Sequence, residues 1–504
     1  MHPPIPEPAG RFVAPLALVA ALFCSPVWAG DVHEYRIRID PSMSRMHVEA
    51  RFAGAVDSVT ARSNEAGDFL IDARNCGDEM PIRLRNRRMM LPATGIRCMT
   101  YTVDLARAAM QQRYNRALAP GNVVVPPSLW LWRPKLTADA EIRVHFALPA
   151  HIRVAVPWQA IDGESQSYRL TSSPESSSAP AVFGSFDYRE IEVPGAVLRV
   201  SILQSGDRHD LGLDPQAIAE WLRATATDVS LAYGRFPNPE PQVVVIPVGN
   251  ERGSGDSAVP FGRVIRDGGE AVELFVDQRQ PLHALLGDWT ATHEFSHLML
   301  PYIEEQHRWV SEGFAQYYQN VLLARSGAYD SQKAWQELYD GFERGRKSRP
   351  ELSPNAATAA GIRSARMKIY WSGAALALMA DVALRERSGG KESLDDVMGR
   401  LQSCCLPSRR VWSAPEFFAT LDQLASYPVF MPLYRRYADT AGFPDTRPLF
   451  ARLGLKVMDE KVRIQRGGEL QQIRIAITKT DPATAEWREQ LAAHERASRY
   501  HAGN

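Results

Sequence analysis

His293-Glu294-Phe295-Ser296-His297 is the stretch of sequence that decides the fold around it. Residues four apart lie on one face of an α-helix, so His293 and His297 can direct their imidazole nitrogens at one metal ion. Glu294 lies beside that face, where a carboxylate can act as general base toward an attacking water. A catalytic zinc ion takes three protein ligands and keeps one position open, so this pattern predicts a third ligand elsewhere in the chain.

A second predicted helix supplies the best candidate for the third ligand. Apolar residues at helical spacing run from about residue 306 to residue 325, and Pro301 ends the helix that carries the two histidines. Glu312 lies one turn into the second helix and off its apolar stripe, so its carboxylate can face back toward the first helix. We therefore predict that His293, His297 and Glu312 hold a zinc ion.

Other residues near the predicted third ligand compete less well for that role. Glu304 and Glu305 fall in the predicted turn, close to the end of the first helix. His307, Arg308 and Trp309 could line the cleft, but we interpret them as surface and packing residues. A lone His-Glu-x-x-His pattern also arises by chance, and its agreement with the second motif argues against that interpretation.

These motifs resemble a known group of enzymes. The pairing of residues 293–297 with Ser311-Glu312-Gly313-Phe314-Ala315 is similar to that in the gluzincin metallopeptidases, and within them to the alanyl and glycyl aminopeptidase families. The segment Ile369-Tyr370-Trp371-Ser372-Gly373-Ala374-Ala375 resembles a Tyr-x-Lys-Gly-Ala segment of these families, with Ser372 in place of the lysine. Residues 393–398, Ser-Leu-Asp-Asp-Val-Met, resemble a segment of the glycyl group. The resemblance covers roughly residues 190 to 400.

The resemblance implies a catalytic role for Tyr370. In these families the corresponding tyrosine donates a hydrogen bond to the tetrahedral intermediate. Such a donor complements the other predicted groups: zinc polarises the carbonyl and Glu294 activates water, while the developing oxyanion gains from a second donor. Without the resemblance, Tyr370 would be interpreted as an aromatic residue on a buried helix.

The sequence departs from the aminopeptidase pattern at one functional position. These families carry a Gly-x-Met-Glu-Asn type strand before the first histidine, and its glutamate holds the free amine of the substrate. Residues 253–264 of this chain contain no glutamate. Asp256, Glu270 or Glu273 could take its place, and nothing in the sequence chooses among them. An amine anchor distinguishes an exopeptidase from an endopeptidase, so both modes stay open here.

The composition is that of an ordinary globular protein of several domains. The chain has 504 residues, of which 45% are hydrophobic and 23% are charged. Its 58 lysines and arginines balance 58 aspartates and glutamates. A neutral chain offers no electrostatic basis for binding nucleic acid or an anionic membrane, so we expect a peptide or protein substrate and no nucleic-acid partner.

Residues 1–29 have the pattern of a secretory signal peptide. The apolar run Phe12–Phe23 is too short to span a bilayer, and Val27-Trp28-Ala29 offers small residues at the cleavage-determining positions. Cys24 would allow lipid attachment, but the bulky residues before it favour cleavage after Ala29. No later stretch approaches the ~18 apolar residues of a membrane helix. We therefore predict an exported protein, periplasmic or secreted, with no transmembrane segment in the mature chain.

Four cysteines follow the predicted cleavage site. Cys76 and Cys98 lie in one strand-rich region and could form a disulfide, which suits an exported protein. Cys404 and Cys405 are adjacent, and adjacent cysteines rarely pair with each other without strain. We therefore expect these two to be free, buried or joined elsewhere.

The pattern of apolar residues predicts a multidomain α+β protein. Residues 30–205 alternate apolar and polar positions over short runs, which indicates an N-terminal β-sandwich-like domain. Residues 206–330 combine a helix, buried strands and the two ligand helices, as in a thermolysin-like catalytic domain. Residues 331–450 form a mostly helical region. Residues 451–504 form a C-terminal tail with alternating runs at 462–464 and 473–477, the pattern of short strands. The tail ends in a charged segment, residues 487–500, for which we expect either an exposed helix or a frayed end.

Together these features predict a zinc metallopeptidase that hydrolyses peptide bonds and is aminopeptidase-like. One alternative is a non-catalytic binding or scaffold protein that retains a gluzincin fold, which the missing amine anchor and Ser372 favour. The complete set of ligands, base and tyrosine argues against it. A zinc hydrolase of a non-peptide substrate is a further alternative, because the same zinc chemistry serves other bonds.

Overall fold

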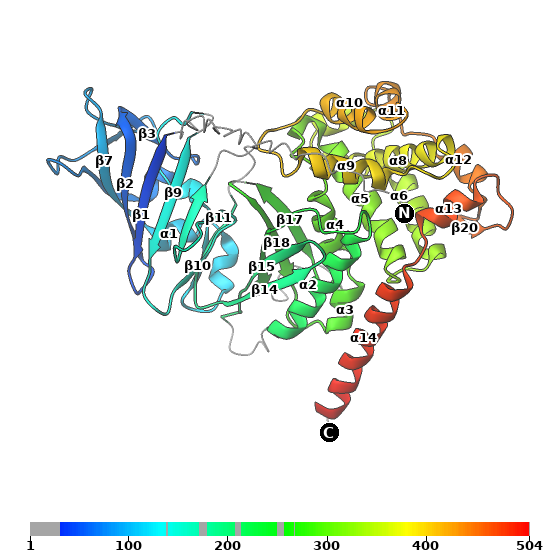
Figure 1. Ribbon diagram of the computed structural model, residues 1–504, viewed down its shortest axis with the longest axis horizontal. Helices are drawn as coiled ribbons and strands as arrows, with labels where there is room; N and C mark the ends of the chain where they lie inside the picture. Colours follow the sequence, from blue (N-terminus) through cyan, green and yellow to red (C-terminus); the bar gives the residue numbers. More distant parts are fainter. Residues whose placement is uncertain are drawn as a thin grey trace, which may run out of the picture.

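The computed structural model describes residues 31–137, 140–170, 179–206, 213–248, 257–266 and 268–502, with side chains to residue 493. The predicted signal peptide (1–29) and Asp256 lie outside the described residues. A β-rich N-terminal part stands at one end of the molecule and a helical part at the other, with a five-stranded sheet between them (Figure 1).

The N-terminal part is built from three sheets. Alternation of side chains sets its core: Tyr35 and Ile37 of the first strand are buried, whereas Arg36 and Arg38, which alternate with them, are exposed. The largest sheet has the order β11 (Gln159–Ala160), β12 (Ser167–Leu170), β9 (Glu141–Ala147), β1 (Val32–Ile39), β2 (Arg45–Val56), β7 (Ile96–Asp104) and β4 (Leu70–Asn75). One smaller sheet has the order β10 (Arg153–Ala155), β13 (Ala181–Gly184) and β8 (Asn122–Val125). The other has the order β3 (Ser58–Thr60), β6 (Arg88–Met90) and β5 (Arg83–Arg85). The short helix α1 (Leu105–Ala109) follows β7, and the predicted N-terminal β region is confirmed.

The central sheet carries the elements that support the site. Its order is β14 (Asp187–Val193), β15 (Ala196–Ile202), β16 (Gln242–Pro247), β18 (Glu270–Val276) and β17 (Phe261–Arg266). Strands β14 and β15 precede residue 205, so the last strands of the predicted first domain pair with the strands of the second. β16 is buried on both faces, because Val243 packs in the cluster formed with the helices and Val244 packs against the N-terminal strands.

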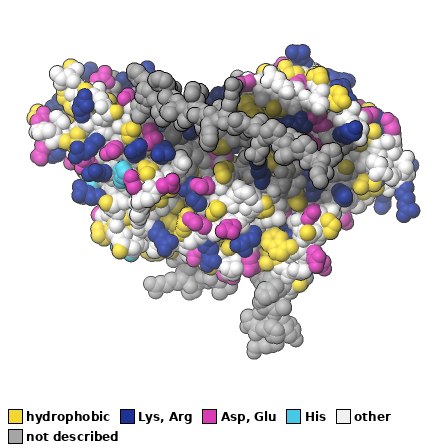
Figure 2. Space-filling model, in the orientation of Figure 1, with side chains coloured by type: hydrophobic (Ala, Val, Ile, Leu, Met, Phe, Trp, Pro, Cys, Tyr) yellow, Lys and Arg dark blue, Asp and Glu magenta, His cyan; other side chains and the backbone are white. Residues whose placement is uncertain are grey.

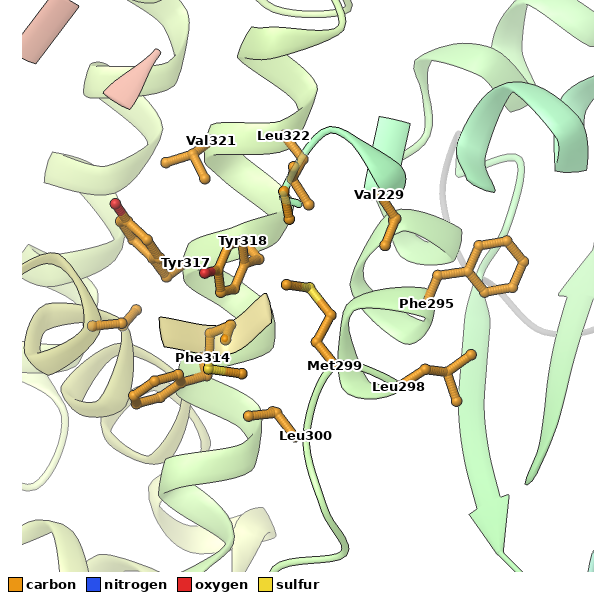
Figure 3. Packing of buried hydrophobic residues seen from close by; sticks show 14 of the residues in the cluster. Val229, Phe295, Leu298, Met299, Leu300, Phe314, Tyr317, Tyr318, Val321 and Leu322 are labelled. Atoms are coloured by element: carbon orange, nitrogen blue, oxygen red, sulfur yellow. The ribbon is translucent and has the colours of Figure 1, made fainter. Parts of the chain in front are cut away.

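Four helices that support the site follow strands of this sheet, one after β15 and three after β18. α2 (Pro215–Ser230) is capped by Asp214, whose side chain accepts a hydrogen bond from the Gln216 amide. α3 (Leu282–Gly287) and α4 (Thr290–His297) follow β18, and α5 (Arg308–Arg325) follows a single 3₁₀ turn. Phe295 of α4 and Met299, two residues after its end, pack in one apolar core with Tyr318 of α5 and Val229 of α2 (Figure 3).

The helical part surrounds one long helix. The helices are α6 (Ser331–Lys347), α7 (Pro354–Ala359), α8 (Ile362–Arg387), α9 (Leu394–Cys405), α10 (Ala414–Leu424), α11 (Phe430–Tyr437) and α12 (Arg447–Arg452). α8 is long and apolar enough to cross a membrane by length and composition alone, contrary to the sequence-based expectation for this region. Its most apolar window is 78% buried inside the protein, which is the pattern of a core helix.

The C-terminal segment ends in a helix that packs against α2 and α3. A hairpin of β19 (Leu455–Met458) and β20 (Lys461–Ile464) precedes α13 (Gln471–Ile477) and α14 (Pro482–Ala502). The alternating run at 473–477 suggested a strand, but Leu470, Arg474 and Ile477 are the buried positions, and that spacing is helical. The predicted C-terminal helix is present as α14.

Both cysteine pairs form disulfides. Cys76 and Cys98 are joined as the sequence suggests, 22 residues apart. Cys404 and Cys405 are joined to each other, which corrects the expectation that they would not pair. Cys405 is the last residue of α9, so the backbone at this pair leaves the helix and the two side chains can meet.

The surface carries both signs of charge. Basic and acidic side chains are interspersed over the described residues of the face in Figure 2. This distribution agrees with the balanced composition, and the described residues of this face form no large patch of one sign.

Candidate metal centre

Helix α4 presents the two histidines on one face. Its start is fixed by Asp288, whose Oδ1 accepts from the Thr290 amide at 2.8 Å, and by the Thr290 hydroxyl, which donates to the Val259 carbonyl at 2.9 Å. His293 and His297 are one turn apart, and their ring centroids lie 4.8 Å from each other. All eight residues of α4 are buried, so packing restricts the rotamers of the two histidines.

Helix α5 brings Glu312 to the same point. Oε2 of Glu312 lies 3.4 Å from Nε2 of His293 and 3.5 Å from Nε2 of His297. The ligand atoms of the three residues all lie within 4.8 Å of one another. Two imidazole nitrogens and one carboxylate oxygen around a common point form a ligand set known from catalytic zinc sites.

The Nδ1 atoms of the two imidazoles, which point away from Glu312, show how the rings are held. Nδ1 of His297 lies 3.1 Å from Oγ of Ser311, which turns Nε2 toward Glu312. Nδ1 of His293 and Oε1 of Gln319 are both buried without a hydrogen bond of ordinary geometry. The Gln319 side chain nevertheless lies close enough to favour protonated His293. Ser311 therefore orients His297, and Gln319 lies beside His293; neither role was predicted from the sequence.

The protonation states suit a metal. Burial lowers the pKa of His297, which keeps the imidazole neutral, as metal binding requires. Burial opposes ionisation of Glu312, yet its hydrogen bonds with His293 and His297 hold the pKa of its carboxyl well below the usual range. Burial also lowers the pKa of His293, but the hydrogen bond with Glu312 and the charge of Glu294 outweigh it and raise that pKa overall. The group therefore attracts positive charge to its centre, and a divalent cation would supply it.

Glu294 lies beside this group in a confined place. Burial raises the pKa of its carboxyl to about 7, although the nearby His293 acts in the opposite direction. A carboxyl with a pKa near neutrality can both accept and donate a proton. A Cβ atom at Gly262 of β17 would lie only 2.5 Å from Cγ of Glu294, so only glycine leaves room for Glu294 at this position.

Tyr370 reaches the site from α8. Its ring stacks on that of His293, with centroids 5.7 Å apart and an angle of 17° between the planes. Burial and the charges of Glu312 and Glu294 raise the pKa of its hydroxyl far above the usual range. The hydroxyl therefore stays protonated and can act as a hydrogen-bond donor at neutral pH.

α8 can bring Tyr370 this close because α5 and α8 cross at two glycines. A Cβ atom at Gly313 would lie 2.2 Å from Cα of Gly373, and one at Gly373 would lie 2.2 Å from the Trp309 carbonyl oxygen. The two backbones therefore touch one residue after Glu312 and three residues after Tyr370.

The candidate amine anchors are occupied elsewhere. Glu273 is buried and forms an ion pair with Arg263 of β17. Glu270 forms an ion pair with Arg266 at 2.8 Å and accepts from Asn238 at 2.6 Å. Of the described residues proposed for this role, neither carboxylate is free to hold a substrate amine.

The neighbours of Glu312 have different roles. Glu304 contacts His307 at 2.7 Å and not the metal-binding group, which agrees with the choice of Glu312 as third ligand. Trp309 is fully buried and stacks on Tyr434, so its interpretation as a packing residue is confirmed. Arg308 was interpreted in the same way, but its Nε donates to Oε1 of Glu312 at 2.8 Å. The spacing of four residues could have indicated this pair.

The segment at 393–398 has a structural role among the described residues. Ser393 and Asp396 form a capping box at the start of α9. Asp395 forms ion pairs with Arg325 of α5 at 3.0 Å and with Arg385 of α8 at 3.4 Å. This segment therefore ties α9 to the two helices that carry Glu312 and Tyr370.

Known proteins match both the site and the fold. Residues 300–372 match the model of the M61 glycyl aminopeptidase family, and this stretch contains Glu312 and Tyr370 but starts after His297. No curated protein matched the chain. The family match and the buried ligand group confirm the resemblance to these peptidases.

Three solved structures match most of the chain. An aminopeptidase N family protein from Idiomarina loihiensis is 14% identical, with a TM-score of 0.62, and the match covers 84% of this chain and 79% of that one. An M1 zinc metallopeptidase from Deinococcus radiodurans is 14% identical, with a TM-score of 0.46 and coverage of 82% and 94%. A mutant of an M1 zinc metallopeptidase from the same organism, bound to a Tyr-Ser-Ala substrate, is 12% identical, with a TM-score of 0.49 and coverage of 82% and 96%. The first of these supports the multidomain α+β fold.

Proposed function

We propose that this protein is a zinc-dependent metallopeptidase that hydrolyses peptide bonds and is aminopeptidase-like, with one zinc ion per chain. The observation that carries the proposal is the buried group of His293, His297 and Glu312, with the carboxyl of Glu294 beside it. A non-catalytic scaffold protein does not need a general base with a pKa near neutrality next to three metal ligands.

Each residue of the group has a defined task. When bound, zinc supplies Lewis-acid chemistry that polarises the scissile carbonyl and makes water a better nucleophile at neutral pH. Glu294 accepts a proton from the attacking water at its carboxylate and delivers it to the leaving amine. The hydroxyl of Tyr370 donates a hydrogen bond to the oxygen on which negative charge develops.

The substrate of this proposal is a peptide or protein. β17 is an edge strand of the central sheet, and its Gly262 lies against Glu294. An extended peptide can pair with the free side of an edge strand, which would bring its backbone past the general base. Because Glu270 and Glu273 are engaged in ion pairs, recognition of a free amine would need another group.

We further propose that the protein is exported, as its first 29 residues suggest. The disulfide between Cys76 and Cys98 supports this proposal, because structural disulfides persist in oxidising compartments. Retention of the chain in the cytoplasm of its own organism would argue against it.

Zinc content and peptide cleavage test the main proposal together. The purified mature protein and Glu294→Gln are compared on a pool of peptides with free and with acetylated N-termini. We expect both proteins to hold zinc and only the wild type to cleave, with Glu294→Gln slower by about 10²- to 10⁴-fold. His293→Ala should lose both metal and activity.

The cleavage pattern distinguishes the remaining possibilities. Cleavage of free-ended peptides only would establish an aminopeptidase, and cleavage of blocked peptides an endopeptidase. Zinc in both proteins without cleavage by either would overturn the peptidase proposal and favour a binding protein or a non-peptide substrate. Undiminished cleavage by Glu294→Gln would refute the assigned general base.

A further inference from the structure

Arg308 makes a direct contact with the third predicted metal ligand. Its Nε donates to Oε1 of Glu312 at 2.8 Å, while Oε2 of Glu312 faces the two histidines. Arg308 is the first residue of α5, and Glu312 lies one turn further on the same helix. The carboxylate is therefore divided: one oxygen is held by the arginine and the other faces the metal-binding group.

The second contact of Arg308 is of a different kind. Nη1 donates to Oε1 of Glu305 at 3.0 Å, but the Glu305 side chain is 72% exposed. An exposed ion pair contributes little to stability, so it does not determine where the guanidinium lies. Glu312, in contrast, is buried, and a charge-assisted hydrogen bond to a buried carboxylate is among the stronger ones in proteins. The inner contact is the one that fixes Arg308.

The separate contacts of the two Glu312 carboxylate oxygens matter for a catalytic metal. A carboxylate can bind a metal through one oxygen or through both, and the second oxygen would occupy a coordination position. A catalytic zinc ion needs an open position for water or substrate. Hydrogen bonds from neighbouring groups orient carboxylate ligands and are needed for full metal affinity.

We propose that Arg308 is a positioning residue for the metal centre, which reserves Oε1 of Glu312 and leaves Oε2 as the single ligand atom. The inference rests on the proposed function, because it requires that the group of His293, His297 and Glu312 binds zinc.

Zinc affinity of the full-length mature protein tests this role without reference to turnover. Zinc is removed, and the dissociation constant is measured by competition with a chromophoric chelator for wild type, Arg308→Met and Arg308→Lys. We expect Arg308→Met to bind zinc about 10- to 100-fold more weakly. Arg308→Lys should recover part of the loss, because lysine can donate one hydrogen bond but lacks the planar fork of arginine.

Two control variants separate positioning from a general effect of charge. Arg366→Met removes a cation that lies over the Tyr370 ring, 5.7 Å from its centroid, without contact to a ligand. Glu305→Gln removes only the outer partner of Arg308. Both should bind zinc within about threefold of wild type, as expected for exposed groups.

X-ray absorption of the zinc-loaded proteins provides a second readout. Wild type should show one carboxylate oxygen in the first shell of zinc, and Arg308→Met should show two, because Oε1 is then free to bind. A residue that only stabilised the fold would leave this number unchanged.

The outcomes distinguish the inference from the proposed function. Absence of zinc binding by wild type would overturn the metal site itself. Zinc binding by wild type and by Arg308→Met with equal affinity and equal coordination would overturn the role of Arg308 alone. An equal loss of zinc affinity in Arg366→Met would show that the effect comes from positive charge alone, and would also overturn the role of Arg308. If Arg308→Met fails to fold, Arg308→Lys decides, and wild-type affinity in that variant would refute the inference.

Discussion

Gly262 is a position near the site where any larger side chain would displace the general base. In Gly262→Ala, the new methyl group would lie 2.5 Å from Cγ of Glu294, so the carboxylate must move by about 1 Å to restore ordinary contact. A displacement of that size at a reacting group costs about 100-fold in rate. We expect Gly262→Ala to keep zinc and to lose about 100-fold in kcat, measured in steady state on the best peptide of the pool. Gly54→Ala is the matched control, because it adds a methyl group to a strand where nothing lies within 4 Å. Equal kcat in wild type and Gly262→Ala would show that Glu294 is not the group that limits turnover.

At the scale of elements, the crossing of α5 and α8 decides whether the ligand and the hydrogen-bond donor meet. In Gly313→Ala, the methyl group would lie 2.2 Å from Cα of Gly373, and a backbone cannot rotate away as a side chain can. Overpacking of a core typically costs about 1–3 kcal/mol, and this contact should reach the upper end of that range. We expect the free energy of unfolding to fall by about 3 kcal/mol and kcat to fall with it, because separation of the helices moves Tyr370 away from the site.

Chemical denaturation and kinetics on the same preparation check the helix-crossing prediction. Gly287→Ala at the end of α3 is the control, because nothing lies within 4 Å of the added methyl group. If Gly313→Ala were as stable and as active as Gly287→Ala, the two helices would not be held by their backbone contact.

For the whole molecule, the disulfide in the N-terminal part should affect stability and not catalysis. Cys76 and Cys98 close a loop of 22 residues, and a loop of that length predicts about 3 kcal/mol of stabilisation through the unfolded chain. We expect the double variant Cys76→Ser, Cys98→Ser to unfold at lower denaturant concentration by this amount, with zinc content and kcat unchanged. Far-ultraviolet circular dichroism during denaturation and a parallel activity assay measure the two properties. A loss of zinc in the folded double variant would contradict this separation.

The ligand group was the part of the molecule most open to prediction from sequence. His293, His297 and Glu312 lie within two adjacent helices, and helical periodicity alone places them on facing sides. Tyr370 could be assigned only through the family resemblance, because its approach depends on contacts between helices distant in sequence. The role of Gly262 was not predictable for the same reason: its neighbour, Glu294, belongs to another element. At 473–477 a short alternating pattern was misleading, since only one face of a helix is buried there.

The contact between Gly313 and Gly373 has a further consequence for how the site can open. At this crossing no side chain stands between α5 and α8, so the two backbones cannot adjust there by a change of rotamer. The two helices that carry Glu312 and Tyr370 should therefore move as one rigid body. Room for bulky substrates has to come from the other side of the site, where β17 is paired with the sheet along one edge only. Complexes with peptides of increasing size should accordingly differ in the position of β17, while the distance between the two glycines stays constant.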